Sequence, residues 1–175
     1  MNNLHRVIKN TRTNEQIIIA KPTDKELLLY NSSVLVSETN LEGIITYTNR
    51  RFQSLSGYTS DELIGSPHNI VRHPDIPKGL FKAMWKIIAE KKIWRGYVKS
   101  LAKDGSYYWT LSYIQAKVNS EGEVTGYTAT RKMAYPESIL EVEAKYEELM
   151  GDEHADHEYF MSAELYHGTN LATRA

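Results

Sequence analysis

The sequence predicts an α+β domain in which a five-stranded antiparallel sheet carries short helices and one long helix over one face. Three observations predict this fold: a hairpin pattern at residues 34–48, helical periodicity at residues 77–91, and three strand patterns between residues 94 and 132. Strands that are grouped on either side of a helical segment, instead of alternating with helices, are typical of α+β domains. One domain fits within 175 residues and leaves length for flanking segments.

A β-hairpin begins the predicted sheet. Residues 34–39 and 44–48 are rich in strand-forming side chains, and residues 40–43, Asn-Leu-Glu-Gly, supply the turn between them. The pattern predicts two paired strands.

Two short helices follow the hairpin. Residues 49–58 place Phe52 and Leu55 on one helical face before Gly57 stops the helix. Thr59 and Glu62 then have the spacing of a capping box, which predicts that a second helix begins there.

The long helix is predicted by its own periodicity. Pro77 can occupy the first turn, and apolar side chains recur at one-, three- and four-residue steps, which gives the helix one apolar face. That face consists of Leu80, Phe81, Met84, Trp85 and Ile88. The pattern predicts a helix that ends near Lys91.

Three antiparallel strands complete the predicted sheet. Residues 94–101, 106–118 and 124–132 have strand patterns, and turn sequences at 103–105 and 119–122 separate them. Together with the hairpin they make five strands.

The two ends of the chain differ from this body, so we expect an N-terminal cap at 1–32, a central domain at 33–134, and an amphipathic helix with an acidic tail at 135–175. Residues 1–16 are polar and predicted to be partly disordered, and residues 24–30 are predicted to form a short helix. An amphipathic helix that Gly151 can end is predicted from the stripe Ile139, Val142, Tyr146 and Leu149. An acidic tail follows, and it contains His154 and His157, which are better explained by a solvated tail than by a metal site.

Composition excludes several classes of protein. The chain has no cysteine, which rules out disulfides, thiolate nucleophiles, zinc–thiolate sites and iron–sulfur clusters. Hydrophobic residues make up 41% of the chain, but no run approaches the ~20 apolar residues of a membrane helix, and no secretory signal is present. We therefore expect a cytoplasmic protein that does not insert into a membrane.

Charge and motifs argue against two further functions. The formal net charge is −1, and no arginine-rich run or basic and aromatic stripe indicates a nucleic-acid partner. No Ser-His-Asp order, P-loop or HExxH motif occurs, so the chain is not expected to be an enzyme.

The segment at residues 67–77 is the strongest indication of a binding site. It contains three prolines together with His68, Arg72, His73 and Asp75. Proline fixes φ and removes a hydrogen-bond donor, so this loop must hold its polar groups in a preset geometry. Preset polar groups on a loop usually serve a ligand.

The order of elements, together with three short motifs, resembles a PAS domain. These motifs are NRRF at residues 49–52, SGY at 56–58 and ELIG at 62–65. The longer segments PHNIVRHPDIPKGLFKAMW, WRGYVKS, KDGSYYW and GYTATR are similar to the flavin-binding PAS domain of bacterial aerotaxis receptors. This resemblance covers residues 33–150. It implies a noncovalently bound FAD whose redox state reports respiratory electron flow to a chemotaxis signalling module.

The resemblance also implies the site. Carried over by position, the cofactor-binding residues are Arg72, His73, Asp75, Trp94, Trp85, Asn69, Ser100 and Asn49. Aromatic walls and positive charge are what a flavin requires, and Asn49 matches a position that affects signalling or cofactor retention. Ser100 departs from the family, which commonly has an asparagine there, and this leaves open a weaker flavin site or another ligand.

Two alternatives to FAD stay open at this point. Haem b could occupy the pocket with His68 or His73 as axial ligand, since PAS domains host haem. The domain could instead be a cofactor-free interaction module. An absorbance spectrum would separate the three.

The expected partner is a membrane-bound methyl-accepting chemotaxis transducer or a HAMP-type module. The 175 residues include neither, so we expect the stand-alone sensory half of a bipartite receptor. It would be cytoplasmic and peripheral to the inner membrane through its partner. A homodimer is a further expectation, because PAS sheets and their flanking helices commonly pair.

Overall fold

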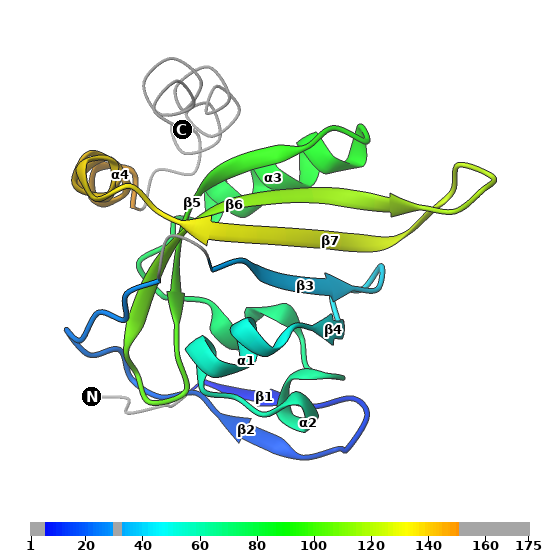
Figure 1. Ribbon diagram of the computed structural model, residues 1–175, viewed down its shortest axis with the longest axis horizontal. Coiled ribbons are helices and arrows are strands. Elements are labelled where there is room, and N and C mark those ends of the chain that lie inside the picture. Colours follow the sequence, from blue (N-terminus) through cyan, green and yellow to red (C-terminus); the bar gives the residue numbers. More distant parts are fainter. Residues whose placement is uncertain (1–5, 30–32, 151–175) are drawn as a thin grey trace.

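A single five-stranded antiparallel sheet organises the chain in the computed structural model, which describes residues 6–29 and 33–150. Its strands are β3 (Leu35–Thr39), β4 (Ile45–Thr48), β5 (Trp94–Leu101), β6 (Tyr107–Val118) and β7 (Val124–Met133). Their order across the sheet is β4-β3-β7-β6-β5 (Figure 1). This confirms the predicted α+β fold, and the last strand in sequence lies at the centre, beside the first.

Four helical segments connect β4 to β5, and all but the 3-10 helix at His68–Val71 are predicted from the sequence. They are α1 (Arg50–Ser56), α2 (Ser60–Leu63), the 3-10 helix η1 (His68–Val71) and the long α3 (Lys78–Ala89). Gly57 ends α1 with φ of 77°, a left-handed conformation that glycine adopts without strain. Thr59 and Glu62 form the predicted capping box of α2.

The N-terminal segment corrects two predictions. Residues expected to be disordered form a hairpin of β1 (Val7–Lys9) and β2 (Gln16–Ile18). Asn10 in its turn is buried and donates hydrogen bonds to three α2-region carbonyls, which fixes the hairpin on the domain. Residues 24–29 contain no helix, and Glu26 instead forms a parallel bridge with Tyr107. Both predictions were wrong because they rested on local sequence, whereas these contacts are made with residues far along the chain.

The two faces of the sheet have different partners because side chains alternate along each strand. We call the face that meets α3 the inner face and the opposite one the outer face. One end of the outer face, around Tyr97 and Trp109, is covered by α4 (Pro136–Leu149), whose buried side chains are Ser138, Val142, Tyr146 and Leu149. In Figure 1, α4 lies at the end of the sheet away from the long β6–β7 turn.

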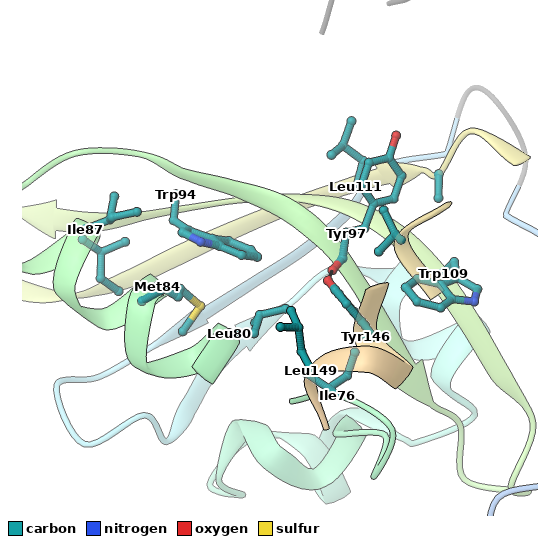
Figure 2. Close-up of a cluster of buried hydrophobic side chains, with 14 residues drawn as sticks. Ile76, Leu80, Met84, Ile87, Trp94, Tyr97, Trp109, Leu111, Tyr146 and Leu149 are labelled. Carbon is teal, nitrogen blue, oxygen red and sulfur yellow. Dashed lines mark hydrogen bonds between the residues drawn. The ribbon is translucent and has the colours of Figure 1, made fainter. Parts of the chain in front are cut away.

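Aromatic side chains join α4 to the sheet. The Tyr146 hydroxyl donates a hydrogen bond to the Tyr97 carbonyl, and the Tyr146 and Trp109 rings lie 5.9 Å apart. Figure 2 shows these residues together with Leu149. The amphipathic stripe predicted from the sequence is therefore buried on its own sheet. Its predicted end at Gly151 lies outside the described residues.

Candidate functional site

A cavity of about 290 Å³ lies between the inner face of the sheet and α3. Its apolar walls are Val71, Phe81, Met84, Val98 and Ile114. Its polar lining includes Ser37, His68, Ser100, Ser112 and Arg131. Ligand sites for small molecules usually enclose ~300–1,000 Å³, so this cavity suits the ring system of a ligand with one polar edge.

The cavity has a buried polar end and an exposed mouth. Arg131 and Ser112 are opposite each other on β7 and β6, and both are buried. Trp85 at the mouth is 42% exposed, and its ring meets Tyr127 edge to face with 4.9 Å between centroids. Of the predicted site residues, Trp85, Asn69, Arg72 and Ser100 line this cavity. A ligand could therefore reach the buried polar groups from the side of α3.

Arg131 is the most buried cation in the lining, with 5% of its surface exposed. Its Nη1 donates to Ser37 Oγ at 2.9 Å and its Nη2 lies 3.0 Å from His68 Nε2. A guanidinium can only donate, so His68 Nε2 must accept, and the imidazole proton then resides on Nδ1. The same His68 nitrogen lies 3.0 Å from Ser37 Oγ, which closes a small network.

Burial and charge set the protonation states in this network. Burial and the nearby Arg131 lower the pKa of His68 to about 3, so the imidazole is neutral at physiological pH. Burial lowers the pKa of Arg131 to about 10, which still leaves it charged. Burial raises the pKa of the adjacent Tyr108 phenol to about 12, so that group is neutral too. The buried end of the cavity thus carries one net positive charge.

Arg72 adds a second cation to the lining. Its guanidinium carbon lies 4.3 Å from the centroid of the Phe81 ring, and its backbone forms a bridge with Ser100 on β5. Arg6 from the N-terminal segment donates to the Arg72 carbonyl at 3.1 Å. Burial lowers the pKa of Arg72. The predicted rigid loop therefore holds this residue against the cavity wall.

His73 and Asp75 do not line the cavity, which differs from the predicted ligand contacts. The buried His73 ring meets Tyr107 edge to face, and its Nδ1 accepts a hydrogen bond from the Asp75 backbone N–H at 3.1 Å. The Asp75 carboxylate pairs with Lys99 Nζ at 2.9 Å. Lys99 also reaches Glu143 of α4 at 3.4 Å. These contacts connect the loop to the outer face.

Two carboxylates flank the single ammonium group of Lys99 on this side. Burial lowers the pKa of Lys99, but the hydrogen bond and ion pairs with Asp75 and Glu143 outweigh it, and the pKa is raised overall. Burial and the nearby Lys99 lower the pKa of His73, so its ring is neutral at neutral pH. Lys99 therefore stays charged between two carboxylates.

Trp94 lies in the core and not in the cavity wall, which also differs from the prediction. Its ring covers Gly96, where an added Cβ would come within 2.4 Å of it. Figure 2 shows it beside Met84 and Ile87. Its Nε1 is buried without a hydrogen-bond partner. The absent side chain at Gly96 lets the indole lie flat along β5.

Asn49 has a structural position outside the cavity lining. Its Oδ1 accepts from the Phe52 and Val36 backbone N–H groups, and its Nδ2 donates to the Val34 carbonyl at 2.9 Å. It therefore caps α1 and ties that helix to β3. An effect of this residue on the cavity would be indirect.

Comparison with known proteins identifies the family. A family model described as the PAS fold matches residues 45–131. The chain is 40% identical over 127 residues to the aerotaxis receptor of Escherichia coli, which covers 73% of this chain and 25% of that protein. This chain carries a PAS domain.

Other relatives resemble the PAS domain more distantly. The nitrogen fixation regulatory protein of Klebsiella pneumoniae is 27% identical over 60% of the chain and 21% of its own length. The chain thus spans only about a quarter or less of these two curated relatives.

Solved structures agree with the fold. A light-oxygen-voltage domain studied with a flavin analogue superposes with a TM-score of 0.55 at 20% identity, covering 66% of this chain and 86% of that one. A PAS domain from Colwellia psychrerythraea gives a TM-score of 0.54 at 22% identity, covering 58% and 86%. At such identities the likeness shows the fold alone.

Sequence reasoning missed several lining residues of the PAS domain, above all Arg131, Ser37 and Ser112. Arg131 ends the motif GYTATR at residues 126–131, so a signal was present. Strand alternation could have placed it on the inner face, but only the sheet order shows that it meets Ser37 and His68.

Two features are absent from residues 6–29 and 33–150, the ranges that the structure describes. No helix there is both long and apolar enough to span a bilayer. No group of three or more His, Cys, Asp or Glu side chains in those ranges could hold a metal ion.

Proposed function

We propose that this PAS domain is a cytoplasmic redox sensor for taxis that binds FAD noncovalently and signals to a chemotaxis transducer. The observation that carries the proposal is the cavity, which has aromatic and aliphatic walls and a buried polar end with positive charge. The 40% identity to an aerotaxis receptor supports the sensory role.

The donor set fits a flavin ring. The ring is flat and apolar over most of its surface, and its pyrimidine edge carries carbonyl groups that need hydrogen-bond donors. Arg131 and the hydroxyls of Ser100 and Ser112 supply donors at the buried end, and Phe81 and Met84 supply apolar wall. Ser112 and Arg131 are on neighbouring strands, so they meet the ligand together. When bound, a flavin supplies reversible electron transfer.

The cavity is too small for a whole dinucleotide, which bears on how FAD would be held. A volume of about 290 Å³ encloses the ring system, so the rest of the cofactor would extend through the mouth. The mouth is lined by the exposed Trp85 and by Asn69, and Arg72 lies on the wall behind them. These residues would hold the outer part of the ligand.

Signal output would pass through α4. Arg72 faces the cavity, and Asp75, three residues later, pairs with Lys99, which contacts Glu143 on α4. A change in the loop on ligand reduction would therefore reach α4 through a short chain of contacts. A ligand can shift α4 only if its two redox states differ in affinity for the two placements of the helix.

The described histidines do not favour haem. His68 Nε2 is already held by Arg131 and Ser37, so iron would have to displace a buried cation from it. His73 lies outside the cavity lining, against Tyr107. The geometry therefore favours flavin over the haem alternative.

The test is an absorbance spectrum of the purified full-length protein, followed by denaturation and identification of the released cofactor by mass. We expect an oxidised-flavin spectrum that bleaches with dithionite and returns in air. Arg72→Ala should lower flavin content with an unchanged far-UV circular dichroism spectrum, whereas Tyr47→Ala, on an exposed residue outside the lining, should leave it unchanged. A Soret band would replace the proposal with a haem sensor, and a colourless protein that takes up no flavin would indicate an interaction module.

A further inference from the structure

Arg131 is a buried cation that donates hydrogen bonds to two neutral side chains. Its guanidinium contacts Ser37 Oγ and His68 Nε2, and its carbon lies 5.4 Å from the Phe52 ring centroid. It is 5% exposed and lines the cavity. An isolated charge in such a place is costly unless something neutralises it.

No neighbouring acid in the described part of the chain neutralises it. Tyr108 is an acidic group close enough to influence the pKa of Arg131, but burial raises the pKa of Tyr108 to about 12, so it is uncharged at neutral pH. Glu42, the carboxylate among the described lining residues, lies on an exposed turn and makes no ion pair with Arg131. Within residues 6–29 and 33–150, no carboxylate comes within 4.0 Å of Arg131.

A second buried cation, Lys99, has charged partners within the protein. Lys99 is similarly buried, at 8% exposure, but it has both Asp75 and Glu143 as partners. Arg131 has the same degree of burial and no such pair. Lys99 also borders the cavity, but its ammonium group pairs with the two carboxylates of the outer face, whereas the Arg131 guanidinium lies at the buried polar end.

We propose that Arg131 is the charged hydrogen-bond donor for the ligand, so that the cavity selects a planar molecule which presents an anionic or carbonyl-rich edge to this guanidinium. The identity of that molecule as a flavin rests on the proposed function. In that case the edge is the pyrimidine side of the ring, with its imide and carbonyl groups. Two of the five guanidinium N–H groups are used by Ser37 and His68, which leaves donors for the ligand.

The network also explains how Arg131 is aimed. His68 must accept from Arg131, and Ser37 Oγ accepts from Nη1, so both neighbours fix the guanidinium plane without supplying charge. Ser37 and His68 also contact each other at 3.0 Å, so they keep a partner if Arg131 is removed. Arg131→Met therefore removes the charge, keeps a long unbranched side chain and leaves Ser37 and His68 hydrogen-bonded to each other.

The experiment compares ligand affinity and stability in the full-length parent and in Arg131→Met. Apoprotein is prepared by flavin extraction, titrated with FAD and with riboflavin, and unfolded in urea with and without saturating FAD. We expect Arg131→Met to lower the affinity for FAD and for riboflavin at least ~tenfold, because the ligand loses a hydrogen bond to a charged group. We expect the same variant to be as stable as the parent or more stable as apoprotein, since an uncompensated buried charge has been removed.

Two controls distinguish an arginine that binds the ligand from one that is structural. Arg131→Lys keeps the charge and should recover part of the lost affinity. Lys99→Met removes the paired cation of the outer face and should destabilise the protein with and without ligand, because it leaves two carboxylates without their partner. Of these variants, only Arg131→Met should stabilise the apoprotein and yet destabilise the complex relative to the parent.

Three outcomes decide the matter. Arg131→Met that binds FAD and riboflavin as tightly as the parent overturns the proposal and leaves the proposed function standing. Arg131→Met that destabilises the apoprotein by as much as the complex assigns Arg131 a structural role and also overturns it. If the parent binds no flavin the proposed function fails, and a more stable Arg131→Met apoprotein would still support an unneutralised cation that awaits another anionic ligand.

Discussion

Each face of the sheet buries one cation, and the two cations differ in their partners. On the outer face, Lys99 lies between Asp75 and Glu143 and so helps to hold α4 in place. On the inner face, the hydrogen-bond partners of Arg131 are Ser37 and His68, and both are neutral. One charge is used within the protein, and the other is available to a ligand. Burial alone therefore does not distinguish a structural charge from a functional one, and the partners do.

The largest expected effect concerns the apolar contact that covers the outer face. Val142 of α4 is fully buried, so Val142→Ala should lower the free energy of unfolding by about 2 kcal/mol, from lost burial and the cavity left behind. Leu140→Ala on the same helix is the matched control, because Leu140 is 72% exposed and its loss should cost less than about 0.5 kcal/mol. Urea unfolding measures both. Equal effects would mean that α4 is not docked as described.

The next effect tests the neutral partner of the inner cation. The pKa of His68 is about 3 in the folded protein against its ordinary 6.5. The unfolded chain therefore takes up the proton first, and the free energy of unfolding falls as the pH drops from 6.5 towards 3. Between pH 6.5 and about pH 5 the loss should be about 1–2 kcal/mol. The groups that face His68 are Arg131, Ser37 and the Phe52 ring.

His68→Gln should flatten this dependence, since an amide oxygen can accept from Arg131 and does not titrate. His73→Gln is the companion variant, because the pKa of His73 is lowered as well and accounts for part of the slope. Urea melts across the pH range measure the slopes. An unchanged slope in His68→Gln would show that His68 is already free to take a proton in the folded state.

A smaller effect should follow from breaking the outer charge pair. Lys99→Gln should cost about 1 kcal/mol, because Asp75 and Glu143 are 62% and 40% exposed and regain water when the lysine is lost. Backbone amides of α4 should exchange faster with solvent. Lys145→Gln removes a more exposed pair with Glu148 and should cost at most about 0.5 kcal/mol. A Lys99 effect no larger than that of Lys145 would remove the outer charge pair from the coupling to α4.

The smallest expected effect concerns Trp94. Its Nε1 is buried without a partner, so Trp94→Phe should change stability by less than about 1 kcal/mol, since relief of an unsatisfied donor offsets the lost volume. Trp109→Phe is a comparison at another buried indole that contacts Tyr146. Thermal unfolding would report both. A loss of several kcal/mol in Trp94→Phe would reveal a partner for the indole nitrogen.

The sequence predicted the elements better than the contacts between them. The hairpin, the capping box of Thr59 and Glu62 and the three later strands are set by local residues, and the structure confirms them. The N-terminal hairpin was missed because Asn10 finds its partners in α2, far along the chain.

The candidate site divides in the same way. Arg72 and Asp75 belong to one rigid loop that the prolines predict, yet only the folded chain shows that they serve opposite sides of the sheet. Arg131 could be read as a motif residue but not as a buried charge, because its neutral surroundings come from three separate segments that contain Ser37, His68 and Tyr108.

The central place of β7 has a consequence for how the chain folds. β3 is the first strand of the sheet and β7 the last, and they pair along the whole length of β3. During synthesis the hairpin of β3 and β4 must therefore wait, with one edge unpaired, until β7 has left the ribosome. Such long-range pairing slows folding and exposes an edge to other chains in the meantime. The strand that delivers Arg131 is also the one that closes the sheet, so a nascent chain cannot bind its ligand before the sheet is complete.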